Sequence, residues 1–228
     1  MVQTRSDLED ADTTIRARPV QYEPIERPKP GRPRDARVHQ AILDTTLQML
    51  SEVGYGRLTI EGVAARAGVG KGTIYRHWPS KGALVVEVIS GPICPIATGK
   101  WTVRLGSLPD SGTLRGDLLT FVQRVHFAFT APLASETLPG LAMDLAQDPD
   151  LADRFRECVV EPKRACLAEA LERARQRGEV GGEVDVHLLC DMLVGPVLYR
   201  SFLTRQAVDD EVAGELVDRV LRTLPLTV

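Results

Sequence analysis

An all-α fold is what the sequence predicts, with a small helical domain followed by a larger one. From Asp35 onward, apolar residues recur at three- and four-residue spacing almost to the end of the 228-residue chain, which is the period of helices packed on one face. No stretch of useful length alternates as a half-buried strand would, and glycine and proline punctuate a connection over residues 91–113. We therefore expect a disordered tail and basic arm over 1–34, one helical domain over 35–80 and a second over 81–228.

Charge is distributed unevenly along the chain. Residues 1–26 carry three Arg against six acidic residues, residues 27–81 carry ten Lys and Arg against four, and the remainder carries fifteen against twenty-one. The net charge of −3 thus conceals a basic block between two acidic ones. Such a block is typical of a segment that meets a polyanion, and an ordinary solvated surface is the alternative.

Several classes of protein are disfavoured by what the sequence lacks. The N-terminus lacks the apolar core of a signal peptide, and no apolar run approaches the length of a membrane span. A cytoplasmic protein without a membrane partner is therefore expected. Cys94, Cys158, Cys166 and Cys190 are scattered, which predicts no metal site and no disulfide framework, while a thiol sensor at Cys158 and Cys166 stays open. Because the common catalytic motifs are missing, neither an enzyme nor a cofactor is expected.

Three helices are expected between residues 35 and 80. The first starts at Asp35 and carries apolar residues at helical spacing. Thr59 is placed to cap the second helix, and Gly68 to end it in the left-handed conformation. After a short turn, Gly70 caps a third helix of about two turns. Two short helices joined by a tight glycine turn are the outline of a helix-turn-helix.

The third helix exposes small and cationic side chains. Ile74 and Trp78 lie four residues apart and can hold it against the preceding helices, so its other residues point outward, as in a helix that enters the major groove of DNA. Candidates for contacts to base edges or phosphate are Lys71, Gly72, Thr73 and Arg76. Candidates for contacts to phosphate alone are Tyr75, His77 and, in the first turn of the next helix, Lys81.

A basic arm precedes the first helix. In the segment KPGRPRDAR, Pro33 would keep Arg32 and Arg34 extended, so that both could reach into a neighbouring minor groove. A solvated linker explains the same residues equally well.

One stretch carries a family resemblance. AILDTTLQMLSEVGYGRLTIEGVAARAGVGKGTIYRHWPSKGALVVEVI, residues 41–89, resembles the DNA-binding domain of TetR/AcrR-type transcriptional regulators along its whole length. The resemblance implies a homodimer whose two recognition helices read a palindromic operator in double-stranded DNA, usually as a repressor. It adds Thr59 to the phosphate-contacting positions. Gly70 departs from the Ser or Thr that is frequent in the family, which removes one possible phosphate contact.

Two other interpretations of this region remain open. A helix-turn-helix can be a packing unit that binds no DNA. A DNA-bending or scaffolding protein without a small-molecule effector would carry the same basic block, but its binding would depend strongly on salt and little on base sequence.

Helical periodicity continues through the second domain. The long helix expected there is interrupted by Pro162, where a kink or a brief break is predicted. Asp185 and Asp209 are placed to cap the last two helices. Five helices are expected, over residues 114–129, 138–146, 150–177, 185–204 and 209–224.

The last two helices are the candidates for dimerisation. LVGPVLYRSFLT, residues 193–204, resembles the dimerisation helix of one TetR subgroup. With the final helix it would form a four-helix interface across a two-fold axis, although some of its apolar residues must face the protomer core. The predicted interface residues are Leu189, Leu193, Val197, Leu198, Leu216, Val217, Val220 and Leu221.

An effector pocket between the middle helices is implied by the same family. A cavity with an apolar lining would suit a small apolar or aromatic effector, whose binding would move the fourth helix and change the spacing of the recognition helices. Each candidate also has the spacing of an ordinary core residue. The candidates are Phe121, Val125, Phe129, Met143, Phe155, Val159 and Tyr199.

Overall fold

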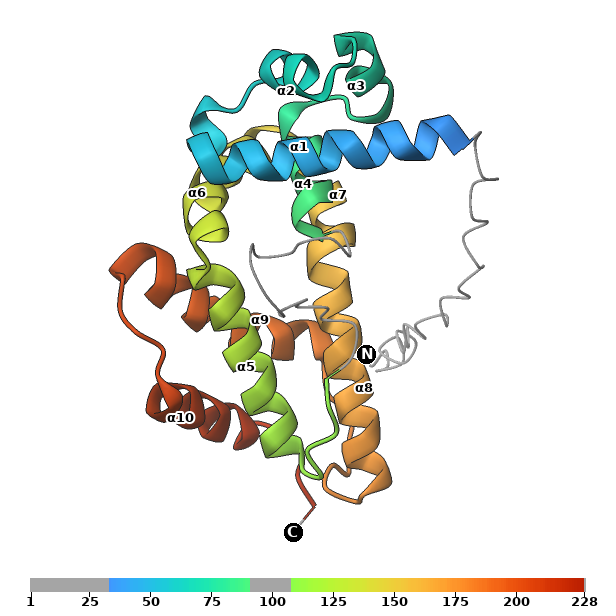
Figure 1. The fold of residues 1–228 in the computed structure, drawn as a ribbon. Coiled ribbons are helices and arrows are strands. Elements are labelled where there is room, and N and C mark those ends of the chain that lie inside the picture. The colour runs from blue at the N-terminus through green and yellow to red at the C-terminus, as the bar shows by residue number, and fades with distance from the viewer. Residues whose placement is uncertain (1–32, 91–107, 228) are drawn as a thin grey trace, which may run out of the picture.

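The computed structural model describes residues 33–90 and 108–227 of the chain. The described residues form helices joined by short connections, without a strand, which confirms the all-α prediction. α1 (Pro33–Arg57), α2 (Ile60–Ala67) and α3 (Lys71–His77) gather at one end of the molecule, and α4 (Lys81–Ser90) leads away from them (Figure 1).

The larger part of the molecule is built around two long helices, α5 and α8, which pack against each other along the length of the molecule (Figure 1). α9 and α10 pack on α5 at the end remote from α3. The elements after α4 are α5 (Leu114–Thr130), α6 (Pro132–Gln147), α7 (Pro149–Phe155), the π-helical η1 (Arg156–Val160), α8 (Glu161–Gln176), α9 (Val186–Leu198), the π-helical η2 (Tyr199–Thr204) and α10 (Asp210–Leu221).

The helix caps predicted from the sequence are confirmed. The Thr59 hydroxyl oxygen accepts a hydrogen bond of 3.1 Å from the Gly62 N–H, and Gly68 ends α2 with φ 68° and ψ 31°. The Asp185 and Asp209 side chains accept backbone hydrogen bonds at the starts of α9 and α10. The three side-chain caps satisfy N–H groups that a helix start leaves without partners, and Gly68 closes a helix end.

Two helices start earlier than predicted, and both start at proline. α1 begins at Pro33 rather than Asp35, and α6 begins at Pro132 rather than near Leu138. Proline is well suited to the first helical position, because the N–H that it lacks has no partner there. Pro132 was expected to close α5, and it opens α6 as well.

The kink predicted at Pro162 takes the form of a π-helical turn. α7, η1 and α8 follow one another without a break, and η1 ends two residues before Pro162. Proline cannot donate an N–H to the preceding turn, and a wider π turn accommodates this local irregularity. The segment therefore marks a change of hydrogen-bond pattern within an otherwise continuous rod.

Apolar packing divides the molecule into two cores, and the division does not fall at residue 80. The N-terminal core unites α1–α4 with α6 and α7, for instance through Trp78, Leu84, Leu141 and Leu151. The C-terminal core unites α5 with α8–α10. The boundary crosses the rod at η1, since residues of α7 pack with the first core and residues of α8 with the second.

One helical stretch, Val186–Thr204, is long and apolar enough to cross a membrane by length and composition alone. The sequence was expected to contain no such run; Asp191 and Arg200 lie within this one. A single stretch of this kind is weak support for a membrane span, since core helices of soluble proteins share these properties. Here Leu193 and Val197 are fully buried in the C-terminal core.

Candidate nucleic-acid interface

A tight turn joins α2 to α3. The Val69 N–H donates to the Ala64 carbonyl at 3.0 Å, across the left-handed Gly68. Gly70 then caps α3 through its backbone, because its carbonyl accepts from the Thr73 N–H at 2.9 Å. Since Gly70 has no side chain, this helix start lacks the side-chain cap that Thr59 provides for α2.

The orientation of α3 is set by two buried side chains. Ile74 and Trp78 are 0 % exposed and belong to the N-terminal core. Four of the predicted DNA contacts consequently lie on the exposed side of α3, namely Lys71, Gly72, Tyr75 and Arg76. Thr73 is half-buried at the edge of this face. The outward face contains small, aromatic and cationic side chains, which suits approach to DNA.

Gly72 keeps the leading end of this face thin. A Cβ atom built on Gly72 would find no heavy atom within 4 Å. Nothing among residues 33–90 and 108–227 therefore requires glycine there, and the φ angle is not in the left-handed region. The space beside Gly72 is available to an approaching molecule.

Lys71 has an ion-pair partner within the protein. Its ammonium lies 2.8 Å from the carboxylate of Glu61 on α2, and both side chains are more than half exposed. The hydrogen bond from Lys71 keeps the pKa of Glu61 below its ordinary value. A contact between Lys71 and a DNA phosphate would therefore replace the ion pair of Lys71 with Glu61.

Lys81, predicted to contact phosphate, has partners within the protein. Its ammonium lies 4.1 Å from the centroid of the Tyr55 ring. It also donates a hydrogen bond of 3.2 Å to the Tyr55 carbonyl oxygen. The Tyr55 hydroxyl in turn donates to Asp144 on α6, and burial together with this carboxylate raises the pKa of Tyr55. Lys81 thus joins the end of α1 to α4, a contact that could not be predicted because its partner lies 26 residues away.

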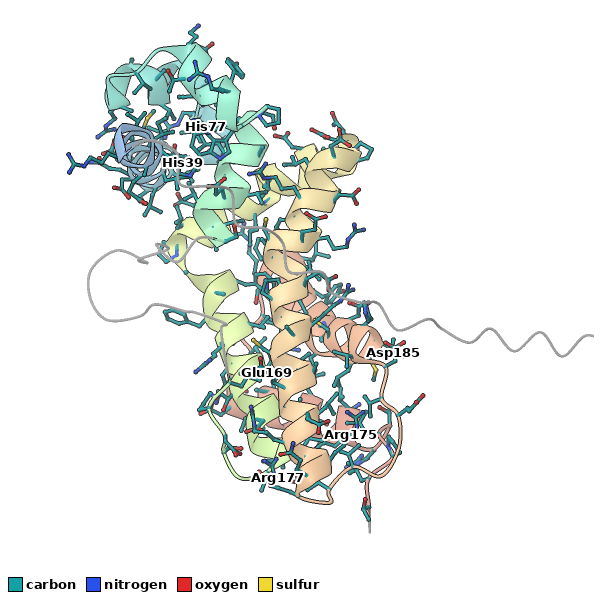
Figure 2. All side chains as sticks on the ribbon, turned by 90° about the vertical axis from the view of Figure 1, so that its right-hand side faces the viewer. His39, His77, Glu169, Arg175, Arg177 and Asp185 are labelled. Carbon is teal, nitrogen blue, oxygen red and sulfur yellow. The ribbon has the colours of Figure 1, made fainter. Side chains whose placement is uncertain are left out.

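His77 also lies differently from the prediction. Its ring is half-buried and contacts His39 of α1 edge to face, with 5.4 Å between the centroids (Figure 2). The centroid of the His77 ring also lies 5.4 Å from the centroid of the Trp78 ring. His77 is therefore part of an aromatic cluster at the end of α3, and His39 is a residue of this region that the sequence did not reveal.

The remaining predicted DNA contacts lie outside α3. Thr59 is exposed, and its hydroxyl hydrogen is available to a phosphate while its oxygen caps α2. Arg34 lies in the first turn of α1, so it is not part of an extended arm. Arg32 lies outside the described residues.

The seven candidate effector contacts do not come together around one site. Phe121, Val125 and Phe129 pack in or against the C-terminal core, whereas Phe155 packs against the N-terminal core. Val159 lies in η1 between them. The other two are exposed, Met143 by 62 % and Tyr199 by 55 %. Helical spacing cannot reveal which of two cores a side chain joins, and this accounts for the mixed set.

The predicted interface residues of the last two helices face largely inward. Leu189, Leu193, Val197, Val217 and Val220 are buried in the protomer's own C-terminal core, and Leu216 and Leu221 pack against it. Leu198 is exposed. Besides Leu198, the exposed large apolar residues of α9 and η2 are Leu188, Tyr199 and Leu203. Both faces of α9 are apolar, so the pattern could not tell the inner face from the outer one.

Known proteins resemble this chain over most of its length. Residues 42–88 match the family model described as bacterial regulatory proteins of the tetR family, and residues 108–220 match the tetracyclin repressor-like C-terminal domain. An HTH-type transcriptional regulator of Mycobacterium tuberculosis is 30% identical, over 85% of this chain and 89% of its own length. The DNA-binding transcriptional repressor TetR of Mycobacteroides abscessus is 31% identical, over 81% of this chain and 92% of its own.

Solved structures agree with these relatives. A crystal structure of a TetR family transcription regulator has a TM-score of 0.66 and 32% identity to this chain, and the match covers 82% of this chain and 98% of that one. The capped helix-turn-helix, the family models and these relatives lead to one conclusion: the chain belongs to the TetR family of helix-turn-helix transcriptional regulators.

Proposed function

We propose that this regulator binds a palindromic DNA operator as a homodimer, represses transcription, and is released by a small apolar or aromatic effector. The observation that carries the proposal is the exposed face of α3, with Gly72, Tyr75 and Arg76 outward and Ile74 and Trp78 fixed in the core. A relative named as a transcriptional repressor supports the direction of control. Such a protein acts in the compartment that holds the chromosome, the cytoplasm.

The outer face of α9 and η2 supports the homodimer. Leu188, Leu198, Tyr199 and Leu203 are between 43% and 72% exposed in the single chain, which is unusual for an apolar stripe on a soluble protein. A second copy that places the same stripe across a two-fold axis would cover both. The dimer would present two copies of α3 to the two half-sites of a palindrome.

An effector site is proposed around the aromatic residues between α5 and η2. Phe129 and Phe202 meet edge to face with 5.6 Å between their ring centroids, and Phe121 of the same helix α5 is buried in the C-terminal core against which Phe129 packs. Aromatic side chains of this kind favour apolar or aromatic ligands.

The proposal is tested by selection from genomic DNA. The purified protein is incubated at near-physiological salt with sheared DNA of its own genome, and the retained fragments are sequenced. Enrichment of one palindromic site is expected. Retention without a common site, disappearing as salt rises, would indicate a phosphate-binding scaffold protein instead.

Base reading and phosphate binding are expected to separate in two variants. Arg76→Ala should change the preferred base at one position in each half-site, with about 1–3 kcal/mol lost at that position. Tyr75→Ala should weaken binding to all sequences alike. Binding of both variants to a panel of single-base operator changes measures this, and indistinguishable profiles would contradict the assignment.

Gly72→Ala is expected to affect stability and DNA binding in opposite directions. Alanine should stabilise α3 by up to about 1 kcal/mol, because a helical glycine loses more conformational freedom on folding, and the added methyl meets no atom of the residues that the structure describes. The same methyl should weaken operator binding about tenfold, equivalent to about 1.4 kcal/mol. Urea unfolding and DNA titration test the two effects, and unchanged binding would show that Gly72 lies away from the DNA.

Leu203→Glu is expected to shift the protein toward monomers. A charge in the centre of a buried apolar contact costs several kcal/mol when unpaired, and Leu203 is 72 % exposed in the single chain. Light scattering after gel filtration measures the mass. Met143→Glu is the control, since Met143 is similarly exposed at 62 % but lies on α6; monomers in both variants, or in neither, would contradict the assigned face.

A further inference from the structure

Glu87 on α4 binds three separate parts of the protein at once. Its two carboxylate oxygens accept hydrogen bonds from His39 Nε2 at 2.7 Å, Trp78 Nε1 at 2.7 Å and Arg154 Nη2 at 3.0 Å. His39 belongs to α1, Trp78 follows α3, and Arg154 belongs to α7. A carboxylate can only accept, so all three neighbours donate to it.

This carboxylate holds the end of the recognition helix. The His39 ring stacks on Trp78 with 4.7 Å between centroids and 29° between planes, and Glu87 bonds both rings. α3 has seven residues, of which only Ile74 is buried, so few other contacts hold it. The orientation of α3 therefore depends on Trp78 and on the groups that fix Trp78.

Arg154 brings the rod of α7 and α8 to the same carboxylate. α7 lies close to α4, because a Cβ built on Gly82 would come within 2.5 Å of the Leu151 side chain. Immediately after α7, the rod changes to the π turn of η1 and passes from the N-terminal to the C-terminal core. A bend at such an irregular turn would move Arg154 relative to Glu87.

We propose that Glu87 is a positioning residue for DNA binding and that Arg154 is the side chain through which α7 acts on it. The inference rests on the proposed function, since it concerns how α3 is held for the operator. With Arg154 in place, the carboxylate is oriented toward Trp78 and His39. Withdrawal of Arg154 leaves the carboxylate free to turn toward water, the stack of His39 on Trp78 loosens, and α3 loses its fixed angle.

The test compares variants of the full-length protein on the operator obtained by genomic selection. Arg154→Gln and Glu87→Gln are each expected to weaken binding about tenfold, as loss of a charge-assisted hydrogen bond would. The double variant should bind no more weakly than Glu87→Gln, because Arg154 acts only through Glu87. Arg154→Lys, which keeps the charge, should recover part of the affinity.

Arg156→Gln is the matched control for lost charge. Arg156 is two residues away and pairs with Asp153 on the same rod, so its loss removes the same attraction to DNA without touching Glu87. Equal weakening in Arg154→Gln and Arg156→Gln, or additive losses in the double variant, would overturn the inference. Absence of any selected operator for the parent protein would instead overturn the proposed function.

A spectroscopic measurement separates positioning from general stability. The chain has two tryptophans, Trp78 and Trp101, so a Trp101→Phe background reports Trp78 alone. Arg154→Gln should change the emission of the folded protein, because the hydrogen bond and ring stack at Trp78 are disturbed. All variants are compared in conditions where urea unfolding shows them fully folded, and unchanged emission with weakened binding would contradict the route through Trp78.

Discussion

Asp117→Asn is expected to lower the free energy of unfolding by about 3–5 kcal/mol, the cost of removing one partner from a buried ion pair. Asp117 is fully buried near the start of α5. Its carboxylate accepts from the Ser111 N–H at 2.8 Å, from the Ser111 hydroxyl at 2.7 Å and from Arg173 of α8 at 3.2 Å. Asparagine keeps the shape but leaves the Arg173 guanidinium facing an amide, and urea unfolding at pH 7 measures the loss.

The exposed Asp110 provides the control. It pairs with Arg177 at 3.0 Å, and its side chain is 55% exposed; Asp110→Asn should therefore cost only about 0–1 kcal/mol. Equal losses in the two variants would show that burial of Asp117 does not matter. A loss below 1 kcal/mol in Asp117→Asn would show that Asp110, whose carboxylate lies 4.0 Å from Arg173 Nε, is a sufficient partner for Arg173.

The difference in stability between the parent protein and Asp117→Asn is expected to depend on pH. Burial by itself would raise the pKa of Asp117, but the hydrogen bonds from Ser111 and Arg173 outweigh it and hold the pKa below 3.8. The stabilisation is therefore present above the unfolded value and is lost as pH falls through the lower, folded value. The gap in stability between the parent protein and Asp117→Asn should narrow as pH falls below 4, and a constant gap would contradict the assignment.

Local features of the fold could be predicted from the sequence. Thr59, Gly68 and Asp209 act within a few residues of themselves, so composition and spacing were enough to place these helix ends. Pro132 was ambiguous, because proline ends one helix and suits the first position of the next equally well. The assignment of α6 and α7 to the N-terminal core depends on contacts between distant segments, which helical period does not encode.

The same distinction holds for the candidate site. Tyr75 and Arg76 could be placed outward because Ile74 and Trp78 fix the buried face of α3. The partners of Lys71 and Lys81 could not be predicted, since each lies on another helix, ten residues away for Lys71 and 26 residues away for Lys81. Glu87 did leave a signal: it is the one charged residue between Lys81 and Ser90 in an otherwise apolar helix, and a carboxylate on such a partly buried helix needs partners.

Lys163→Met is expected to raise stability at pH 7 by about 1–3 kcal/mol, against the usual direction for a point substitution. The Lys163 side chain is largely buried at the start of α8, where its ammonium donates to the Val159 carbonyl at 2.7 Å. No acidic side chain pairs with it among residues 33–90 and 108–227. Desolvation by burial lowers its pKa to about 8, an effect that Cys190 and Cys166 oppose only in part.

The pH dependence distinguishes this cause from simple repacking. The folded pKa of Lys163 lies below the ordinary 10.5, so between these values the unfolded chain binds a proton that the native protein does not, and stability rises with pH. Below about 8 the buried cation destabilises the fold in full. The gain in stability from Lys163→Met should therefore shrink as pH rises from 7 to 10, as urea unfolding would show.

The control is Arg175→Met, on the exposed side of α8, which should change stability by no more than about 0.5 kcal/mol. A Lys163→Met protein less stable than its parent at both pH values would mean that Lys163 has an anionic partner, and that its charge supports the fold.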